Sequence, residues 1–279
     1  MTRKHLHRSP WTYATVLGAS AAAIALTTTA PGMASAAGRS PATKPTVVLV
    51  HGAFADSSSW NGVIASLQRA GYPVAAPANP LRGLTQDAGY LSSFLKSVHG
   101  PVVLVGHSYG GSVISQAAAE APNVKALVYI AGFSPDKGEN AADLSSKFPG
   151  STLGPTLNSV SFPLPDGGTG SDLYIKADKF HDQFAADVPK STTDLMAATQ
   201  RPVAASALTD KATAAAWKTI PSWDLVTLQD KNIPAAAQKF MAKRAHSHTI
   251  EIQASHAVPV SHPAAVASLI EKAAHSTVR

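Results

Sequence analysis

A single serine stands where an apolar run changes into a helix-like stretch. In VVLVGHSYGGSVI, residues 102–114, Ser108 lies between Gly106 and Gly110, which gives the spacing G-x-S-x-G. A serine on a very sharp strand-to-helix turn has a strained backbone, and flanking residues without a Cβ avoid collision with neighbouring backbone. This context predicts that Ser108 is a nucleophile whose hydroxyl emerges at the carboxyl end of a sheet. It disfavours the alternative of a glycine-rich turn without a chemical role.

A serine hydroxyl is a weak nucleophile alone, so a histidine base is expected at the end of a later strand. His256 follows the apolar run at 249–252 and so lies at the carboxyl end of that strand, where the catalytic groups of open sheets gather. His246 and His248 precede or begin the same run and belong to its other end. His262 introduces the last helix and needs no chemical role. We therefore predict His256 as the base.

Two aspartates compete for the role of the acid that orients the histidine. Asp230 follows the apolar run at 225–228 at its carboxyl end, whereas Asp224 directly precedes that run and should point to the far side of the sheet. The chain order serine, acid, histidine differs from the orders of the two main serine protease lineages, and it is the order expected where the serine stands on a strand-to-helix turn. We therefore predict Asp230 as the acid.

A third element must stabilise the negative charge of a tetrahedral intermediate. A glycine-containing loop follows the apolar run at 46–50, and the amides of Ala53 and Tyr109 are the predicted donors of an oxyanion hole. His51 in this loop is interpreted as a structural residue whose ring bonds to loop backbone, because one base suffices. His107, beside the nucleophile, is interpreted in the same way, with its side chain pointing away from the cleft.

Aromatic side chains lie close in sequence to these loops. Phe54, Tyr109 and Phe133 are predicted to supply apolar walls for a substrate. Trp60 is a further candidate, but a role as an ordinary core residue on a helix face explains it at least as well.

Short apolar runs alternate along the chain with longer amphipathic or alanine-rich stretches. Strand and helix in alternation, with strands apolar on both faces, predict an α/β fold: a mostly parallel central sheet with helices on both faces. The expected strands are 46–50, 73–77, 102–105, 126–130, 225–228 and 249–252. The expected helices are 59–70, 86–98, 112–120, 235–245 and 263–274.

The region from about 133 to 221 breaks this alternation. It is rich in Pro, Gly, Ser, Asp and Lys, with helical patches near 177–188 and 193–208 and no convincing strand. A connection of this length in a compact domain usually has its own structure or a function. We expect a helical lid insertion over one edge of the sheet, because its apolar residues disfavour the alternative of a disordered loop.

The amino terminus has the pattern of an export signal. Residues 1–36 begin with three basic side chains, continue through a short alanine-rich apolar stretch and end in Ala34, Ser35 and Ala36. The stretch is short and threonine-rich for a membrane-spanning helix. We predict a cleaved signal peptide at 1–36, a flexible linker at 37–45, one domain at 46–279 and a secreted protein without a membrane anchor after cleavage.

Composition excludes several function classes. Removal of residues 1–36 takes away three basic and no acidic side chains, so the formal charge of +6 falls to +3. This small excess is scattered, which argues against a nucleic-acid partner. The chain has 45% hydrophobic and 14% charged residues, enough apolar material for one large core. Because it has no cysteine, disulfides, thiol nucleophiles and cysteine-bound metals are excluded.

With these motifs the chain resembles the α/β-hydrolase superfamily. The segment 47–83, with VVLVHGAFADSSSW at its start, and the segment 101–114 resemble an exported bacterial esterase-like branch, related to the plant methyl-esterase and hydroxynitrile-lyase group. The resemblance implies a mostly parallel eight-stranded sheet, a lid formed by the insertion, and hydrolysis of esters without a cofactor or metal. Since the expected mature chain begins with what resembles the third strand of that sheet, we expect the first antiparallel strands to be missing or formed from 41–46.

Within this group, lyases that split cyanohydrins carry a threonine after the histidine of the first loop and a lysine after the catalytic histidine. Here these positions are Gly52 and Ala257, and alanine cannot stabilise a departing cyanide. The sequence therefore favours a secreted serine carboxylesterase that acts on small esters through a Ser108–His256–Asp230 triad and an acyl-enzyme. Hydroxynitrile-lyase-like or cofactor-free haloperoxidase-like activity, and a non-catalytic small-molecule-binding protein, are the alternatives.

Overall fold

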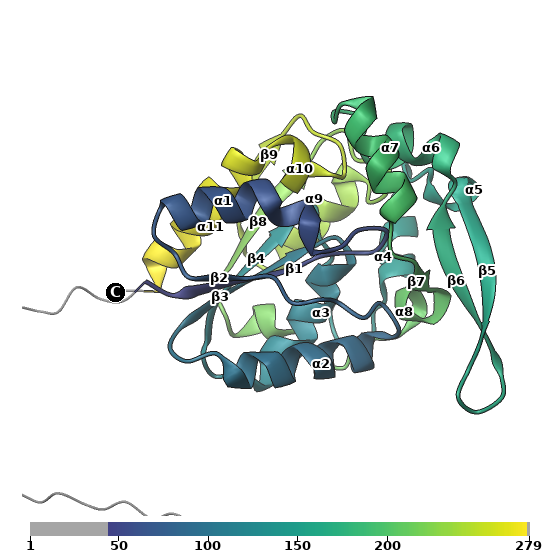
Figure 1. The fold of residues 1–279 in the computed structure, drawn as a ribbon. Coiled ribbons are helices and arrows are strands. Elements are labelled where there is room, and N and C mark those ends of the chain that lie inside the picture. Colours follow the sequence, from purple (N-terminus) through teal and green to yellow (C-terminus); the bar gives the residue numbers. More distant parts are fainter. Residues whose placement is uncertain (1–43, 278–279) are drawn as a thin grey trace, which may run out of the picture. The chain divides into compact units, whose positions relative to one another are not determined.

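Six parallel strands form the centre of the protein, which we describe from a computed structural model covering residues 44–277 (Figure 1). The strand order is β2-β1-β3-β4-β8-β9, so the central strand β3 lies next to both β1 and β4. All six residues of β3 are buried, as expected for an apolar run covered on both faces. The strands are β1 Thr46–Val50, β2 Val74–Ala75, β3 Val102–His107, β4 Val124–Ile130, β8 Ser222–Thr227 and β9 His248–Ile252.

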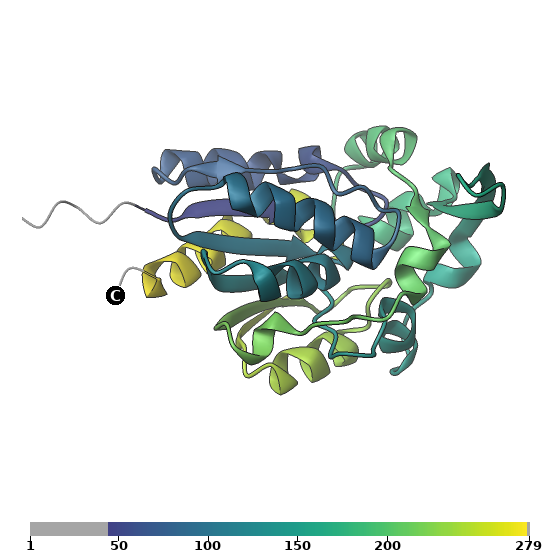
Figure 2. The same cartoon turned by 90° about the horizontal axis from the view of Figure 1, so that it is seen from below.

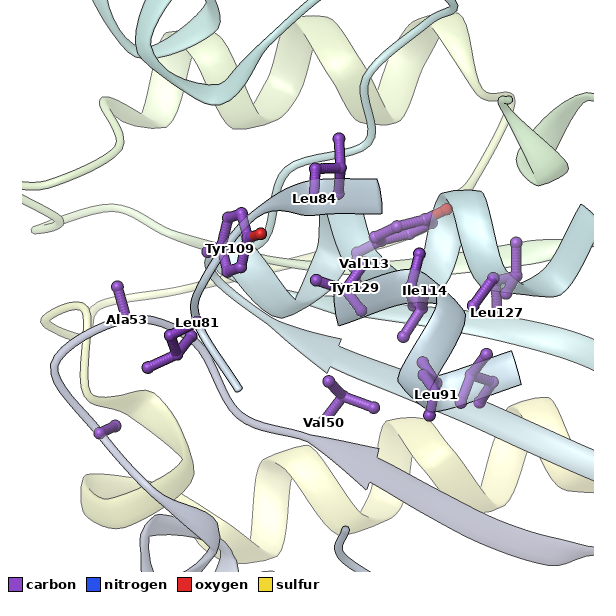
Figure 3. Close-up of a cluster of buried hydrophobic side chains, with 14 of the residues drawn as sticks. Val50, Ala53, Leu81, Leu84, Leu91, Tyr109, Val113, Ile114, Leu127 and Tyr129 are labelled. Atoms are coloured by element: carbon purple, nitrogen blue, oxygen red, sulfur yellow. The ribbon is translucent and has the colours of Figure 1, made fainter. Parts of the chain in front are cut away.

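Helices cover both faces of this sheet (Figure 1). On one face α2 and α3 pack over Val50, Leu127 and Tyr129, and Figure 3 shows side chains of this apolar cluster. On the other face α1 and α11 cover a second cluster. These elements are η1 Ser57–Trp60, α1 Asn61–Arg69, α2 Leu84–Ser97, α3 Tyr109–Ala117, η2 Ala118–Glu120, α9 Ala235–Arg244, α10 Val258–Ser261 and α11 Pro263–Ser276.

The predicted α/β fold class is confirmed, and each predicted strand is present. Two details differ. The strand β8 begins at Ser222, three residues before the predicted start, because Ser222 to Leu225 pair in register with β4. The sheet has six strands in the described residues, not the eight implied by the resemblance, since residues 44 and 45 before β1 form no strand.

Most of the chain between β4 and β8, residues 133–221, folds at the end of the sheet where the strands finish, and its last part returns beside the helix at 109–117 to the start of β8; we call 133–221 the cap (Figures 1 and 2). A helix at 177–184 matches the first expected patch, but the patch expected near 193–208 is divided by the strand at 203–204 into two helices, and the expectation of no strand is wrong. Strands β5, β6 and β7 form an antiparallel sheet of their own. The cap elements are α4 Ala141–Ser146, α5 Leu153–Thr156, β5 Leu157–Pro163, β6 Thr169–Ile175, α6 Ala177–Phe184, α7 Lys190–Thr199, β7 Val203–Ala204, α8 Ala205–Thr209 and η3 Ala216–Lys218.

The signal peptide predicted at 1–36, and the linker at 37–45 except for its last two residues, lie outside the described residues. Among the helices of residues 44–277, none combines the length and the apolar character that crossing a membrane requires.

Candidate active site

Ser108 occupies the sharp turn between β3 and α3. Its backbone has φ 55° and ψ −125°, a left-handed conformation that is strained for a residue with a side chain. The surrounding chain fixes this conformation: the Ser108 amide donates to the Ile130 carbonyl at 3.2 Å, and the Ser108 carbonyl accepts from the amides of Gly111 and Phe133. The strained strand-to-helix turn expected from the sequence is therefore present.

The glycines around the turn are required by close backbone contacts. A Cβ at Gly106 would lie 2.5 Å from the Gly110 carbonyl oxygen, and one at Gly110 would lie 2.5 Å from the Val50 carbonyl oxygen. Real Cβ atoms do not approach backbone this closely, so a side chain at either position would force the turn apart. The G-x-S-x-G spacing is thus a packing requirement of this turn.

His256 and Asp230 form a buried pair. Each lies in a loop that follows the carboxyl end of its strand, β9 and β8 respectively, and His256 Nδ1 lies 2.7 Å from Asp230 Oδ2. The exposed fractions of the two side chains are 1% and 0%. The loops thus bring together two residues that are 26 positions apart in the sequence.

Asp230 receives hydrogen bonds from several other groups. Its Oδ1 accepts from the amides of Asn232 and Ile233, and its Oδ2 accepts from Thr227 Oγ1 and Gln238 Nε2 at 3.0 Å each. A carboxylate with this many donors is held in one orientation. It can therefore orient the His256 ring through Nδ1 and leave Nε2 for chemistry.

Ser108 and His256 line the same cavity, which has a volume of about 550 Å³. Within residues 44–277, no hydrogen bond joins Ser108 Oγ to the His256 ring. In ligand-free sites such contacts are often long and tighten only when substrate binds. The arrangement has the components of a general-base-activated serine.

The two amides predicted for the oxyanion hole also lie at this cavity. Ala53 and Tyr109 both line it, and within the described residues neither backbone N–H donates a hydrogen bond to another group. The Tyr109 side chain is anchored elsewhere, because its hydroxyl donates to Asp87 Oδ2 at 2.8 Å. Burial, with the Asp87 charge next to it, raises the pKa of Tyr109, so the phenol stays neutral. The position of Tyr109 on α3 is thereby fixed.

The cavity walls are mainly apolar and come from both the sheet end and the cap. The predicted wall residues Phe54, Tyr109 and Phe133 all line it. The lining contains no Asp, Glu, Lys or Arg, and His256 is its one titratable group besides Tyr109. Cap and loop residues complete it: Ala141, Ala142, Ser145, Ser146, Phe148, Pro149, Gly150, Ser151, Leu153, Gly154, Pro155, Leu157, Leu208, Asn232 and Ile233.

The remaining histidines near the turn have structural contacts. The His51 ring bonds the Gly52 carbonyl through Nδ1 and accepts from the Asn79 amide through Nε2, at 2.9 and 3.0 Å. The His107 ring lies 2.9 Å through Nε2 from the carbonyl of His256. Burial lowers the pKa of His51 and lowers the pKa of His107 well below its usual range, so both are neutral. His107 therefore braces the backbone that carries His256.

The other candidates from the sequence lie away from the cavity. His248 begins β9 and stacks on Trp223, and His246 precedes the same strand. His262 precedes α11 and bonds Ser261. Trp60 is fully buried in the core cluster against α11, so it packs in the interior and does not line the cavity.

Asp224 also lies outside the cavity, but not at the start of a strand as predicted. It is the third residue of β8, fully inside the sheet, and pairs in register with Tyr129 and Thr249. Neither carboxylate oxygen has a hydrogen-bond partner in the described residues. Burial raises the pKa of Asp224 well above its usual range.

Several residues of the site carried no signal in the sequence. Thr227 and Gln238 contact Asp230 but belong to no motif, and the cap wall comes from a region that looked irregular. Within residues 44–277, no group of three or more His, Asp or Glu side chains is arranged to hold a metal ion.

Comparison with known proteins agrees with this architecture. A family model described as "Alpha/beta hydrolase family" matches residues 47–269. The solved structure of polyneuridine aldehyde esterase superposes with a TM-score of 0.72 at 18% identity, covering 82% of this chain and 99% of that one. At this identity the likeness concerns the fold alone.

Two curated relatives are similar in sequence. A carbendazim hydrolyzing esterase of Nocardioides sp. (strain SG-4G) is 34% identical over 113 residues, which is 36% of this chain and 47% of that esterase. The match therefore spans about half the length of that relative. A pyrethroid hydrolase of Sphingobium wenxiniae is 26% identical over 253 residues, covering 80% of this chain and 85% of the relative.

Proposed function

The chain belongs to the alpha/beta hydrolase family, and from this premise we propose that it is a serine carboxylesterase with Ser108 as nucleophile, His256 as general base and Asp230 as the orienting acid. The observation that carries the proposal is the buried His256–Asp230 pair, 2.7 Å apart, at a cavity that the strained Ser108 also lines. The relatives described as an esterase and a pyrethroid hydrolase support the same class of reaction.

In the proposed mechanism, His256 Nε2 takes the proton of Ser108 Oγ, which attacks the carbonyl carbon of the ester. The amides of Ala53 and Tyr109 stabilise the negative oxygen of the tetrahedral intermediate. His256 returns the proton to the departing alcohol, and the acyl group remains on Ser108. His256 then takes a proton from water, which attacks the acyl carbonyl. The bond to Ser108 Oγ breaks, His256 returns the proton to Oγ, and the acid is released.

The substrates we propose are small, uncharged esters with an apolar group. A cavity of about 550 Å³ has the volume of an ordinary small-molecule site. Its lining offers no cation to pair with a carboxylate, and burying an unpaired charge is costly. A matched pair of probes tests this: 4-nitrophenyl butyrate should have a kcat/KM at least about 100-fold above that of mono-4-nitrophenyl succinate. Equal values would contradict the apolar assignment.

Turnover of aryl esters of rising chain length tests the reaction itself. Ser108→Ala and His256→Ala should each lower kcat by about 10⁴-fold or more, with far-ultraviolet circular dichroism unchanged. Turnover that survives either change in a folded protein would assign the chemistry to other residues.

A lyase on the same fold is the nearest alternative. Ala257 has no charge, is buried, and its amide donates to the Phe184 carbonyl at 3.0 Å, so this position offers no cation for cyanide. Mandelonitrile cleavage assayed with the same preparation should stay at the level of the Ser108→Ala variant.

We also propose that the protein is exported and cleaved after Ala36, on the basis of the amino-terminal sequence pattern. Expression of the full chain in a secreting bacterial host should place esterase activity in the medium, with the mature chain beginning at Ala37. A chain without residues 1–36 is the control and should remain in the cells. Intact full-length protein in the cell fraction would contradict export.

A further inference from the structure

The loop that carries His256 is held on both sides by the cap. On one side the Ser255 amide donates to Asp187 Oδ2 at 3.0 Å, and the Ser255 hydroxyl donates to Asp187 Oδ1. On the other side the Ala257 amide donates to the Phe184 carbonyl at 3.0 Å. Both acceptors lie at or just after the end of the cap helix α6. The two neighbours of the base therefore bond to the cap.

The loop side of these contacts is buried, whereas the Asp187 side chain is 21% exposed. Ser255 is 3% exposed and Ala257 is 1% exposed. Burial raises the pKa of Asp187, but hydrogen bonds from the Ser255 hydroxyl, the Ser255 amide and the Ser261 side chain lower it, and the net shift is downward, so the carboxylate is ionised at neutral pH. Charge-assisted hydrogen bonds of this kind are stronger than those between neutral groups. The Ser261 side chain and His262 Nδ1, the latter at 3.5 Å, are further polar neighbours of the same carboxylate.

His256 itself lies between β9, which ends at Ile252, and α10, which begins at Val258. No sheet ladder holds it there, and the ring is bonded at Nδ1 to Asp230. The Phe184 ring packs against the imidazole with centroids 5.0 Å apart. Placement of the imidazole therefore depends on the loop backbone, and a misplacement of about 1 Å can cost about 100-fold in rate.

We infer that Asp187 is a positioning residue for the general base: acting through Ser255, the cap holds the 254–257 loop so that His256 Nε2 faces Ser108. The inference rests on the proposed function, in which His256 is the base. It assigns the cap a second role besides lining the cavity, since the segment that covers the substrate also sets the geometry of catalysis.

The test is steady-state kinetics of Asp187→Ala with 4-nitrophenyl butyrate. We expect kcat to fall by about 10- to 100-fold while KM changes less than about threefold, because the misplaced group acts on chemistry and not on binding. Asp187→Asn should recover part of the loss, since its Oδ1 still accepts from the Ser255 amide. The matched control is Asp194→Ala, an exposed cap aspartate that pairs with Lys190 and should leave kcat unchanged.

A double-mutant cycle separates positioning from general stability. Ser255→Ala and Asp187→Ala should have less than additive effects on kcat, because both break the same contact. Three results would overturn the inference: additive effects of the two changes, a kcat of Asp187→Ala no lower than that of Asp194→Ala, or a rise in KM with kcat unchanged. If Asp187→Ala does not fold, the test uses Ser255→Ala and Asp187→Asn, for which we also expect kcat to fall with little change in KM.

Failure of this inference differs from failure of the proposed function. Activity retained in Ser108→Ala would overturn the serine mechanism whatever Asp187 does. Activity lost in Ser108→Ala and His256→Ala but unchanged in every Asp187 variant would overturn only the positioning role.

Discussion

Two aspartates, six residues apart, occupy opposite environments in and after β8. Asp230, in the turn after the strand, accepts hydrogen bonds from two backbone amides and three side chains. Asp224, inside the strand, has no partner within the described residues. Both side chains are buried, so burial alone does not distinguish a site residue. What distinguishes Asp230 is its donors, which hold the carboxylate in one orientation beside His256.

The largest expected difference between the two aspartates is in catalysis. Asp230→Asn should lower kcat by about 10⁴-fold. Where Asp230 Oδ2 accepts from His256 Nδ1, the asparagine can place an NH2 group that donates, so the ring is held in the wrong tautomer. Asp224→Asn should change kcat by less than about threefold, since this residue does not line the cavity. Parallel kinetics of the two variants measure the contrast. A larger loss for Asp224→Asn would reverse the assignment.

The donors around Asp230 can be removed without touching the triad. Gln238→Met keeps the side-chain volume but removes the bond to Asp230 Oδ2 and those to Thr227 and Ile233. We expect kcat to fall about tenfold as the acid loses its fixed position. Unfolding free energy should also fall by about 1–3 kcal/mol, because buried partners are left unpaired.

Urea unfolding measures the second effect and esterase kinetics the first. Gln116→Met is the control, since the Gln116 Oε1 accepts from the Thr213 amide and contacts no triad residue. A Gln238→Met variant with wild-type kcat would mean that the remaining donors suffice to hold Asp230.

The smallest effect concerns stability and pH at Asp224. Its pKa is raised in the folded protein, so the folded state keeps a proton that the unfolded state releases above its usual pKa of about 3.8. The contribution of Asp224 to the free energy of unfolding is therefore most favourable below pH 3.8, and it declines as the pH rises toward the raised pKa of the folded protein. Asp224→Asn removes this decline.

The measurement is the unfolding free energy of wild type and Asp224→Asn at pH 4.5 and pH 8. The unfolding free energy of the variant relative to that of wild type should increase as pH rises. The increase is up to about 1.4 kcal/mol per pH unit between the pKa values of Asp224 in the unfolded and folded states. A difference that is the same at both pH values would show that Asp224 does not exchange its proton on unfolding.

The sequence could predict those parts of the molecule whose structure is determined mainly by residues close together in the chain. The six strands were predictable because strands of a parallel sheet that is buried on both faces are nearly continuous apolar runs in the sequence. The nucleophile turn was predictable because close backbone contacts around Ser108 require glycine at 106 and 110, which gives a short motif in the sequence. The chain positions of Asp230 and His256 at strand ends led to their pairing in space.

The rest depends on partners distant in sequence. β5 is mostly exposed and β6 is mostly half-buried, and polar residues interrupt both, so no apolar run marks them. They are strands because they pair with each other. The start of β8 was misplaced because Ser222 and Asp224 do not look apolar, although the ladder with β4 includes both. The contact of Ser255 with Asp187 spans 68 positions and has no local signature.

The central claim is that Ser108 becomes the covalent nucleophile of this site. The most direct measurement is mass spectrometry of peptides after reaction with an uncharged alkyl fluorophosphonate. The predicted result is one adduct, on the peptide that contains Ser108, with labelling abolished in Ser108→Ala and strongly slowed in His256→Ala. An adduct on another residue, or labelling of Ser108→Ala at the wild-type rate, would contradict the account.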